Sequence, residues 1–290
     1  MDLLVQLNRA MAYIEEHICD DIALANVSSV TVYSEYHFGR LFYYIADMPL
    51  SEYIRKRKLS LAAMDLQSEC GKVIDLAVKY GYDSADSFTR AFVKQHGITP
   101  TIARKQGVMF NIFPLITFQI KIKGVQAMNW RIEQREAFEV FGIERIFKGD
   151  DVNKVPDFWA ELQQNGEYDK LLEAGDGGTI GWPFSEGACT INAVVGRHEP
   201  GGGVMPYMLC VLKREDSDTD GYTVSQIPAA TWAVFREEGM TDHNDCQIPK
   251  LFQRAYSEWL PSSGYDKVLG PDLEVYGEHF EEVWIPVIKK

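Results

Sequence analysis

The chain has 290 residues, 46% of them hydrophobic, and a formal net charge of −13 at pH 7. Its five cysteines stand apart without a Cys-x-x-Cys pair, which argues against a zinc site or a disulfide framework and indicates reduced thiols. The start of the chain lacks the basic residues of a signal peptide, and the most apolar stretch, residues 110–120, is far shorter than the ~20 residues that span a bilayer. We therefore expect two domains of a cytoplasmic protein without membrane segment, metal or cofactor.

The negative charge is unevenly distributed along the chain. Residues 1–107 hold 12 Lys and Arg against 13 Asp and Glu, whereas the remaining residues hold 17 against 29. The acidity therefore belongs to the C-terminal part. In the N-terminal part the basic residues gather around particular segments, above all residues 55–58, and a local field of this kind can steer DNA binding.

Helical patterns fill the first hundred residues. Apolar side chains recur at three- and four-residue steps over residues 3–18, which predicts a helix with one apolar face. Asp20 and Asp21 are expected to cap a shorter second helix, Ser84 to cap a later one, and Gly81 and Gly97 to end helices. The longer helices are expected at residues 34–45, 49–68, 73–80 and 84–96.

The pattern of apolar residues changes after Gly107 from helical spacing to strand-like alternation. We therefore place the domain boundary near 107–112, giving domains 1–107 and 112–290. Residues 116–122 alternate with period two, as a half-buried strand does. Paired strands, a helix and further strands then occur twice, which indicates an internal duplication. Further strands are expected at 129–134, 137–146, 189–195, 207–212, 222–227, 231–236, 273–276 and 281–287, and helices at 157–164 and 248–259.

The N-terminal part resembles the AraC/XylS family of transcription regulators. The similarity covers residues 5–105 and is carried by residues 34–42, 49–59, 80–92 and 96–100. It implies an all-α domain with two helix-turn-helix motifs, whose recognition helices can read two successive major grooves of promoter DNA without a dimer partner. The chain has Thr31-Val32 where the family usually has a glycine, and a β-branched residue in a left-handed turn would be strained.

The residues expected to face DNA lie in the N-terminal part of each recognition helix. Arginines there can bind the O6 and N7 atoms of guanine or a phosphate, and Asp86 can accept from cytosine or only favour the helix dipole. Gly39 has no side chain with which to read bases, so the first helix is expected mainly to position the protein on DNA. The candidates are Glu35, Tyr36, Gly39 and Arg40 in the first helix and Ala85, Asp86, Thr89 and Arg90 in the second.

Residues 112–290 resemble the gyrase-inhibitor-like (GyrI-like) effector-binding domains found behind bacterial DNA-binding modules. The similarity lies in residues 138–143, 156–159, 227–235, 271–276 and 282–287. It implies an α+β domain built from two copies of a strand–helix–strand–strand unit around a central cleft. The fold class we expect is therefore multidomain: an all-α tandem helix-turn-helix domain followed by a duplicated α+β domain.

The last strand offers a candidate effector site. Alternation places Phe280, Glu282 and Trp284 on one face, so a carboxylate lies between two aromatic rings. A buried carboxylate needs a partner, and an aromatic cation would supply one. The resemblance also implies that an acidic residue at the position of Glu282 contacts the ligand. Trp284, Trp159, Tyr207, Trp182 and Phe147 are candidate pocket walls, although each can equally be a core residue.

These features favour a one-component transcriptional regulator. Its partners would be double-stranded promoter DNA, a small cationic or amphiphilic effector and RNA polymerase. Two alternatives stay open: a hydrolase that uses Glu282 near Tyr207, and a ligand-binding protein whose specific DNA binding is weak or lost. No nucleophile, metal-ligand or phosphate-loop motif supports catalysis, so no catalytic or metal-binding residue is expected.

Overall fold

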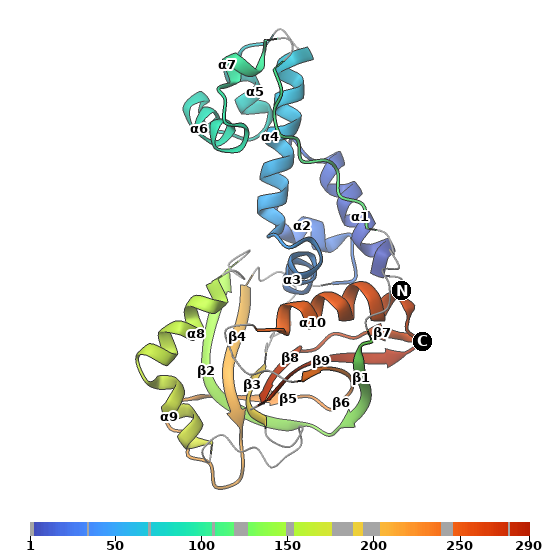
Figure 1. Ribbon diagram of the computed structural model, residues 1–290, viewed down its shortest axis with the longest axis vertical. Coiled ribbons are helices and arrows are strands. Elements are labelled where there is room, and N and C mark those ends of the chain that lie inside the picture. The colour runs from blue at the N-terminus through green and yellow to red at the C-terminus, as the bar shows by residue number, and fades with distance from the viewer. Residues whose placement is uncertain are drawn as a thin grey trace.

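The computed structural model describes residues 3–33, 35–68, 71–105, 108–118, 127–148, 154–175, 188–193, 204–238, 246–277 and 279–290. A helical N-terminal part lies on top of an α+β part, and helix α3 lies directly against helix α10 of the latter (Figure 1). This contact between the two parts has consequences for function.

The first helical bundle follows the expected apolar periodicity. It consists of α1 (Leu3–Glu16), α2 (Leu24–Ser29), α3 (Glu35–Ala46) and the start of α4 (Leu50–Ser68). Its core is not closed off from the rest of the molecule. Leu7 and Phe42 belong to one continuous apolar cluster with Phe252 and Val283 of the α+β part.

The second bundle has a core of its own. The end of α4 packs with α5 (Val73–Lys79), α6 (Ala85–His96) and α7 (Pro100–Ala103) around Phe88 and Phe92. The expected helix ends are confirmed: Gly81 and Gly97 have φ angles of 80° and 73° after α5 and α6. Glycine tolerates this left-handed conformation because it lacks a Cβ atom.

Ser84 caps α6, as the sequence predicts, and its removal should weaken the second bundle. Its Oγ accepts a hydrogen bond from the backbone N–H of Ser87 at 3.1 Å. We expect Ser84→Ala to lower the free energy of unfolding by about 1 kcal/mol in a urea titration. Ser68→Ala, which removes an exposed hydroxyl at the end of α4, is the control. Equal stability of the two variants would contradict the capping role.

Three local predictions are wrong. Asp20 and Asp21 do not cap α2, whose N-cap is Ala23 without a side-chain bond. Asp47 is the non-glycine residue with positive φ in the described chain, so the turn at residues 31–32 is not left-handed. The Thr31 hydroxyl donates to Ser28 O and accepts from Tyr33 N, which stabilises that turn without strain.

The third wrong prediction concerns residues 116–118, which form no strand. Residues 108–118 are instead an extended connector that runs back along α4 and α1. The Asn8 side chain bonds both backbone groups of Phe118, at 2.9 Å each, and Arg57 donates to Phe113 O. Side chains thus supply the bonds that a neighbouring strand would otherwise supply. Residues 119–122 lie outside the described chain.

The α+β part contains one curled antiparallel sheet in the order β1-β6-β9-β8-β3-β4-β2-β5, with β7 paired to β9. Apart from the one expected at residues 116–122, the expected strands form within the described residues, whereas the short β7 and helix α9 were missed. The elements are β1 (Asn129–Arg135), β2 (Phe138–Lys148), α8 (Val155–Gln164), α9 (Glu167–Ala174), β3 (Ala188–Ala193), β4 (Val204–Leu212), β5 (Thr223–Ile227), β6 (Ala230–Glu238), α10 (Ile248–Arg254), a π-helical turn (Ala255–Trp259), α11 (Leu260–Ser262), β7 (Tyr265–Lys267), β8 (Leu273–Gly277) and β9 (Phe280–Lys289).

The strand order confirms the predicted duplication. The unit β2–α8/α9–β3–β4 has its counterpart in β6–α10–β8–β9, and β3 pairs with β8 where the two units meet. The sheet order therefore reads symmetrically outward from that pair. Helices of both units lie on the same side of the sheet, where α8 and α10 flank the line between the units (Figure 1).

Strand alternation divides the side chains of this sheet between two clusters. Tyr207 and Leu209 of β4 pack with Phe158 of α8, whereas Met208 packs with Trp284 in another cluster. Neighbouring residues on a strand point to opposite faces. The two faces therefore carry separate sets of functional candidates.

Candidate functional site

Helix α3, the expected first recognition helix, lies against the α+β part through Arg40 and Tyr44. Gly39 and Arg40 are buried, and Glu35 in the first turn is half-buried. Tyr36 also lies in α3, but its side chain is outside the described residues. The assignment of these four residues to base or backbone contact stays a prediction, and in this arrangement Arg40 faces protein.

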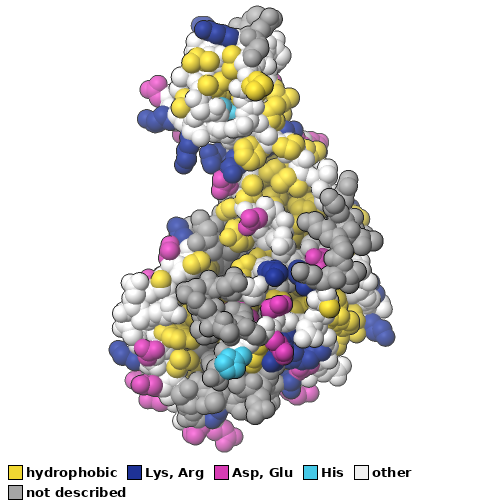
Figure 2. Space-filling model, in the orientation of Figure 1, with side chains coloured by type: hydrophobic (Ala, Val, Ile, Leu, Met, Phe, Trp, Pro, Cys, Tyr) yellow, Lys and Arg dark blue, Asp and Glu magenta, His cyan; other side chains and the backbone are white. Residues whose placement is uncertain are grey.

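Helix α6, the expected second recognition helix, presents exposed candidate residues. Asp86 and Arg90 are exposed, and Ala85 and Thr89 are half-buried. Lys and Arg side chains gather on the edge of the helical part around α6 (Figure 2). Their role as DNA contacts stays a prediction, but their exposure is what a groove-reading helix requires.

The basic run at residues 55–58 is engaged in intramolecular contacts. Arg57 forms two hydrogen bonds to Glu15, at 2.9 and 2.8 Å, which hold α4 against α1. Lys56 pairs with Glu52, and Lys58 Nζ donates to Asp20 O. The pair with Glu15 raises the pKa of Arg57, so its charge is fixed. Arg57 thus serves the fold of the first bundle.

Arg40 ends at a buried carboxylate of the α+β part. Its Nη2 lies 2.6 Å from Oε1 of Glu274 on β8, and the two side chains are only 4% and 5% exposed. The other carboxylate oxygen of Glu274 accepts from Tyr207 Oη at 2.7 Å and Tyr276 Oη at 3.3 Å. Trp159 Nε1 in turn donates to Tyr207 Oη at 3.1 Å. We call Glu274, Tyr207, Tyr276 and Trp159 the Glu274 site.

Aromatic rings also enclose the guanidinium group. Arg40 Cζ lies 4.3 Å from the ring centroid of Phe252 on α10, and the Phe252 ring stacks on Tyr44 at 4.6 Å. Arg40 Nε donates to Tyr44 Oη at 3.2 Å. Glu281 fastens the start of α10 because its Oε2 accepts from Gln247 N and Ile248 N. A cation thus lies between a carboxylate and an aromatic face, an arrangement that attracts positive charge strongly when desolvated.

The tyrosines of the Glu274 site are neutral donors. Burial, followed by the charge of Glu274, raises the pKa of both Tyr207 and Tyr276 well above the ordinary value of 10. The nearby Lys267 is buried against Asp272 at 2.6 Å. Burial lowers the pKa of Lys267, and the charge of Arg40 adds to this effect. Arg40 is therefore the cation that contacts Glu274 directly.

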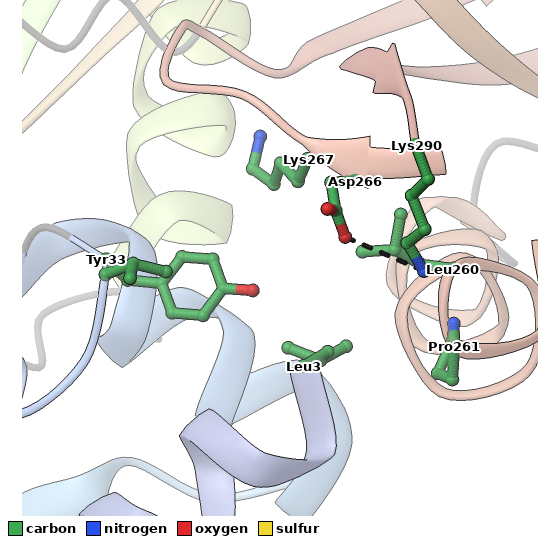
Figure 3. A pocket seen from close by; sticks show the side chains of 8 residues that line it. Leu3, Tyr33, Leu260, Pro261, Asp266, Lys267 and Lys290 are labelled. Carbon is green, nitrogen blue, oxygen red and sulfur yellow. Dashed lines mark ion pairs between the residues drawn. The ribbon is translucent and has the colours of Figure 1, made fainter. Parts of the chain in front are cut away.

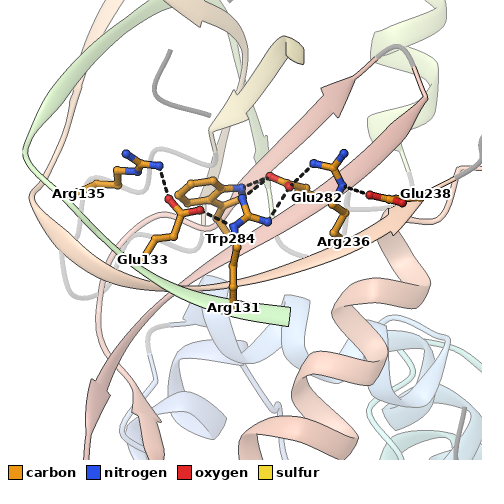
Figure 4. Close-up of polar contacts among 7 residues, drawn as sticks. All are labelled: Arg131, Glu133, Arg135, Arg236, Glu238, Glu282 and Trp284. Carbon is orange, nitrogen blue, oxygen red and sulfur yellow. Dashed lines mark hydrogen bonds and ion pairs between the residues drawn. The ribbon is translucent and has the colours of Figure 1, made fainter. Parts of the chain in front are cut away.

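The predicted effector residue Glu282 is fully buried, and its carboxylate is already paired with arginines of the same domain (Figure 4). Its carboxylate accepts from Arg131 at 2.9 Å, Arg236 at 3.1 Å and Trp284 Nε1 at 2.9 Å. The same arginines also pair with Glu133 and Glu238. The need of a buried carboxylate for a cation, which motivated the prediction, is thus met within the domain. The contact of Glu282 with an effector stays a prediction.

The fold separates the predicted pocket walls. Tyr207 and Phe147 are buried in the cluster under α8, which the half-buried Trp159 adjoins, whereas Trp284 packs against Trp232 in the other cluster. The pairing of Glu282 with Tyr207 on which the hydrolase hypothesis depended is therefore wrong. Trp182 lies outside the described residues. The carboxylate that does meet Tyr207 is Glu274, which sequence reasoning missed.

A small hollow lies between the first bundle and the α+β part, near the end of the chain (Figure 3). It measures about 220 Å³, and Leu3 and Tyr33 line it from one side and Leu260 and Lys267 from the other. This is smaller than the roughly 300–1,000 Å³ of ordinary ligand pockets. The hollow shows that the two parts are not packed to full density where they meet.

Both parts of the chain match known protein families. Residues 131–287, more than half of the chain, match the family described as integron-associated effector binding protein, and residues 27–106 match a helix-turn-helix domain family. The chain is an AraC-type regulator with a gyrase-inhibitor-like effector-binding domain. Both resemblances drawn from the sequence, and the fold class they imply, are confirmed.

The regulator is similar to known transcription regulators over about a third of its length. It is 34% identical to the transcriptional activator AarP of Providencia stuartii over 105 residues, which are 36% of this chain and 78% of AarP. It is 35% identical to the transcriptional regulator Rob of Salmonella typhimurium over 33% of each chain.

Two solved structures are similar to about half of this chain at low sequence identity. A transcription regulation protein of Staphylococcus aureus shares 17% identity over 56% of this chain and 99% of its own, with a TM-score of 0.42. The structure of SAV2435 bound to tetraphenylphosphonium shares 17% over 56% and 94%, with a TM-score of 0.43.

The described residues lack two other kinds of feature. No cluster of three or more His, Cys, Asp or Glu side chains could hold a metal ion there. In the same part of the chain no helix has the length and apolarity needed to cross a membrane.

Proposed function

We propose that this regulator controls transcription in response to a small organic cation that binds at the Glu274 site. The observation that carries the proposal is the guanidinium of Arg40, which lies between Glu274 and Phe252. The side chains around it offer one negative charge, neutral hydroxyl donors and aromatic faces. A ligand with a positive head group on an aromatic body would match each of these features.

Glu274 is a better candidate than Glu282 for ligand binding. The partners of Glu282 come from strands β1, β6 and β9 of the same sheet, and its side chain is 0% exposed. The cation on Glu274 comes from a different bundle, 234 residues away in sequence. Release of Arg40 therefore requires two packed parts to separate but no strand of the sheet to break.

The Glu274→Gln variant tests the proposed site. Phenylguanidinium, which carries the head group of arginine on an aromatic ring, is the probe, and uncharged phenylurea is its neutral counterpart. We expect the substitution to weaken phenylguanidinium binding at least tenfold in isothermal calorimetry, because the amide removes the charge that holds the cation. Phenylurea should bind neither protein measurably.

The matched control for this experiment is Glu161→Gln. Glu161 on α8 also pairs with an arginine, Arg145, but its side chain is 55% exposed, whereas that of Glu274 is buried. This control should bind phenylguanidinium like the wild type. Equal affinities of wild type and Glu274→Gln would refute the site.

We further propose that the regulator acts on promoter DNA in the cytoplasm, with RNA polymerase as a candidate partner, and that it does not catalyse a reaction. The relatives AarP and Rob are named as transcription regulators, which supports this role. At the Glu274 site the carboxylate is bound to a guanidinium and two hydroxyls, which does not suit it to act as a general base. Turnover of an electrophilic ester by the wild type, abolished in Glu274→Gln, would contradict the proposal.

A further inference from the structure

We propose that the arrangement described here is an autoinhibited state, in which the effector-binding domain holds the first DNA-reading helix by its arginine, and that the effector competes with Arg40 for Glu274. The inference rests on the proposed function for the identity of the site. It adds that one side chain has two mutually exclusive positions, in the effector site or in the DNA groove.

The face of α3 that meets α10 is the face expected to read DNA. Arg40 and Tyr44 are one helical turn apart, so they share a face, and both contact Phe252 of α10. The opposite face of α3 holds the buried Phe38 and Phe42, which belong to the core of the first bundle. The face with Arg40 is therefore the one that would be free if α10 were absent.

The dimensions of DNA exclude simultaneous binding. A major groove is about 12 Å wide, and an α-helix with its side chains is about 10–12 Å across. The groove admits α3 alone, but not α3 with α10 lying against its reading face. The second reader α6 has no such cover, since its Asp86 and Arg90 are exposed. The closed molecule thus offers one reading helix to DNA where the open molecule offers two.

Opening would separate α3 and the first bundle from α10. It would break the ion pair and the ring contacts of Arg40 and expose apolar side chains of the cluster that the two parts share. A hollow of about 220 Å³ elsewhere along this contact is space that packed side chains do not fill. Interfaces between domains of one chain commonly permit such relative motion. A cation at Glu274 would take over both the charge and the ring contact of Arg40. Binding energy for the effector would then favour the open state.

The device predicts that loss of Glu274 opens the molecule without any effector. We expect Glu274→Gln to bind a DNA duplex, selected from a random library with the wild type, about tenfold more tightly in fluorescence anisotropy at fixed salt. Glu161→Gln should bind it like the wild type. Phe252→Leu keeps an apolar side chain in the core cluster but removes the ring that contacts Arg40 and Tyr44. It should tighten binding about threefold and provides a second variant should Glu274→Gln fold poorly.

The outcomes separate this inference from the proposed function. If Glu274→Gln and Phe252→Leu both bind the duplex no more tightly than the wild type, the autoinhibition is refuted, even where phenylguanidinium binds at Glu274. If the variants bind DNA more tightly but the wild type binds no phenylguanidinium, autoinhibition stands and the cationic effector is refuted. In the wild type, saturating phenylguanidinium should reproduce the gain seen in Glu274→Gln.

Discussion

Replacement of Arg40 with alanine is expected to lower the free energy of unfolding by about 3–5 kcal/mol, because it leaves Glu274 buried without its cation. The carboxylate would keep the hydroxyl donors of Tyr207 and Tyr276, but neither carries a compensating charge. Chemical denaturation monitored by circular dichroism measures this loss. Added phenylguanidinium should restore more stability to this variant than to the wild type, since it refills the vacated position.

The same substitution should strengthen effector binding. In the wild type, Arg40 competes with the ligand, so the apparent affinity is reduced by the fraction of molecules in the closed state. We expect Arg40→Ala to bind phenylguanidinium about tenfold more tightly in calorimetry. Arg9→Ala, which removes an exposed arginine from the same bundle, is the control for charge. Unchanged stability together with unchanged affinity would show that Arg40 does not occupy the ligand site.

Arg90→Ala is expected to weaken binding to the selected duplex by about 1–3 kcal/mol, or roughly 5- to 150-fold. Arg90 is exposed on α6 and lies four residues, about one helical turn, after Asp86. If it contacts a guanine, the loss will be confined to sequences with that base pair. If it contacts a phosphate, all sequences will be affected and the salt dependence will become shallower by about one unit.

Arg145→Ala is the control for this prediction. Arg145 is 37% exposed and pairs with Glu161 in the effector-binding domain, so its loss changes the net charge equally without touching α6. Titrations at several salt concentrations give both the affinity and its slope. Equal affinities of the Arg90 and Arg145 variants for the duplex would show that Arg90 makes no specific contact with DNA.

The helical part could be predicted closely from sequence because its signals are local. A cap such as Ser84, a left-handed glycine such as Gly97 and the apolar spacing of α1 each act within a few residues. Residues 116–118 show the limit of that approach. They carry a strand-like alternation, but Asn8 and Tyr53 supply their backbone partners, and no sheet neighbour does.

The sequence predicted the chemistry of the site, a buried carboxylate beside aromatic rings, but not which residues form it. The reasoning that a buried carboxylate beside aromatic rings needs a cation applies to both Glu274 and Glu282. Only the fold shows that Arg131 and Arg236 already satisfy Glu282, whereas Arg40 reaches Glu274 from 234 positions away. The alternation of Glu274 and Tyr276 on β8 was the available signal. Nothing in it indicated that the DNA-binding part would supply the partner.

The most direct measurement is a crystal structure of the full chain grown with phenylguanidinium. We expect the ligand's guanidinium to lie on Glu274 and its ring against Phe252, with Arg40 withdrawn and α3 separated from α10. A ligand bound elsewhere while Arg40 still pairs with Glu274 would contradict this expectation.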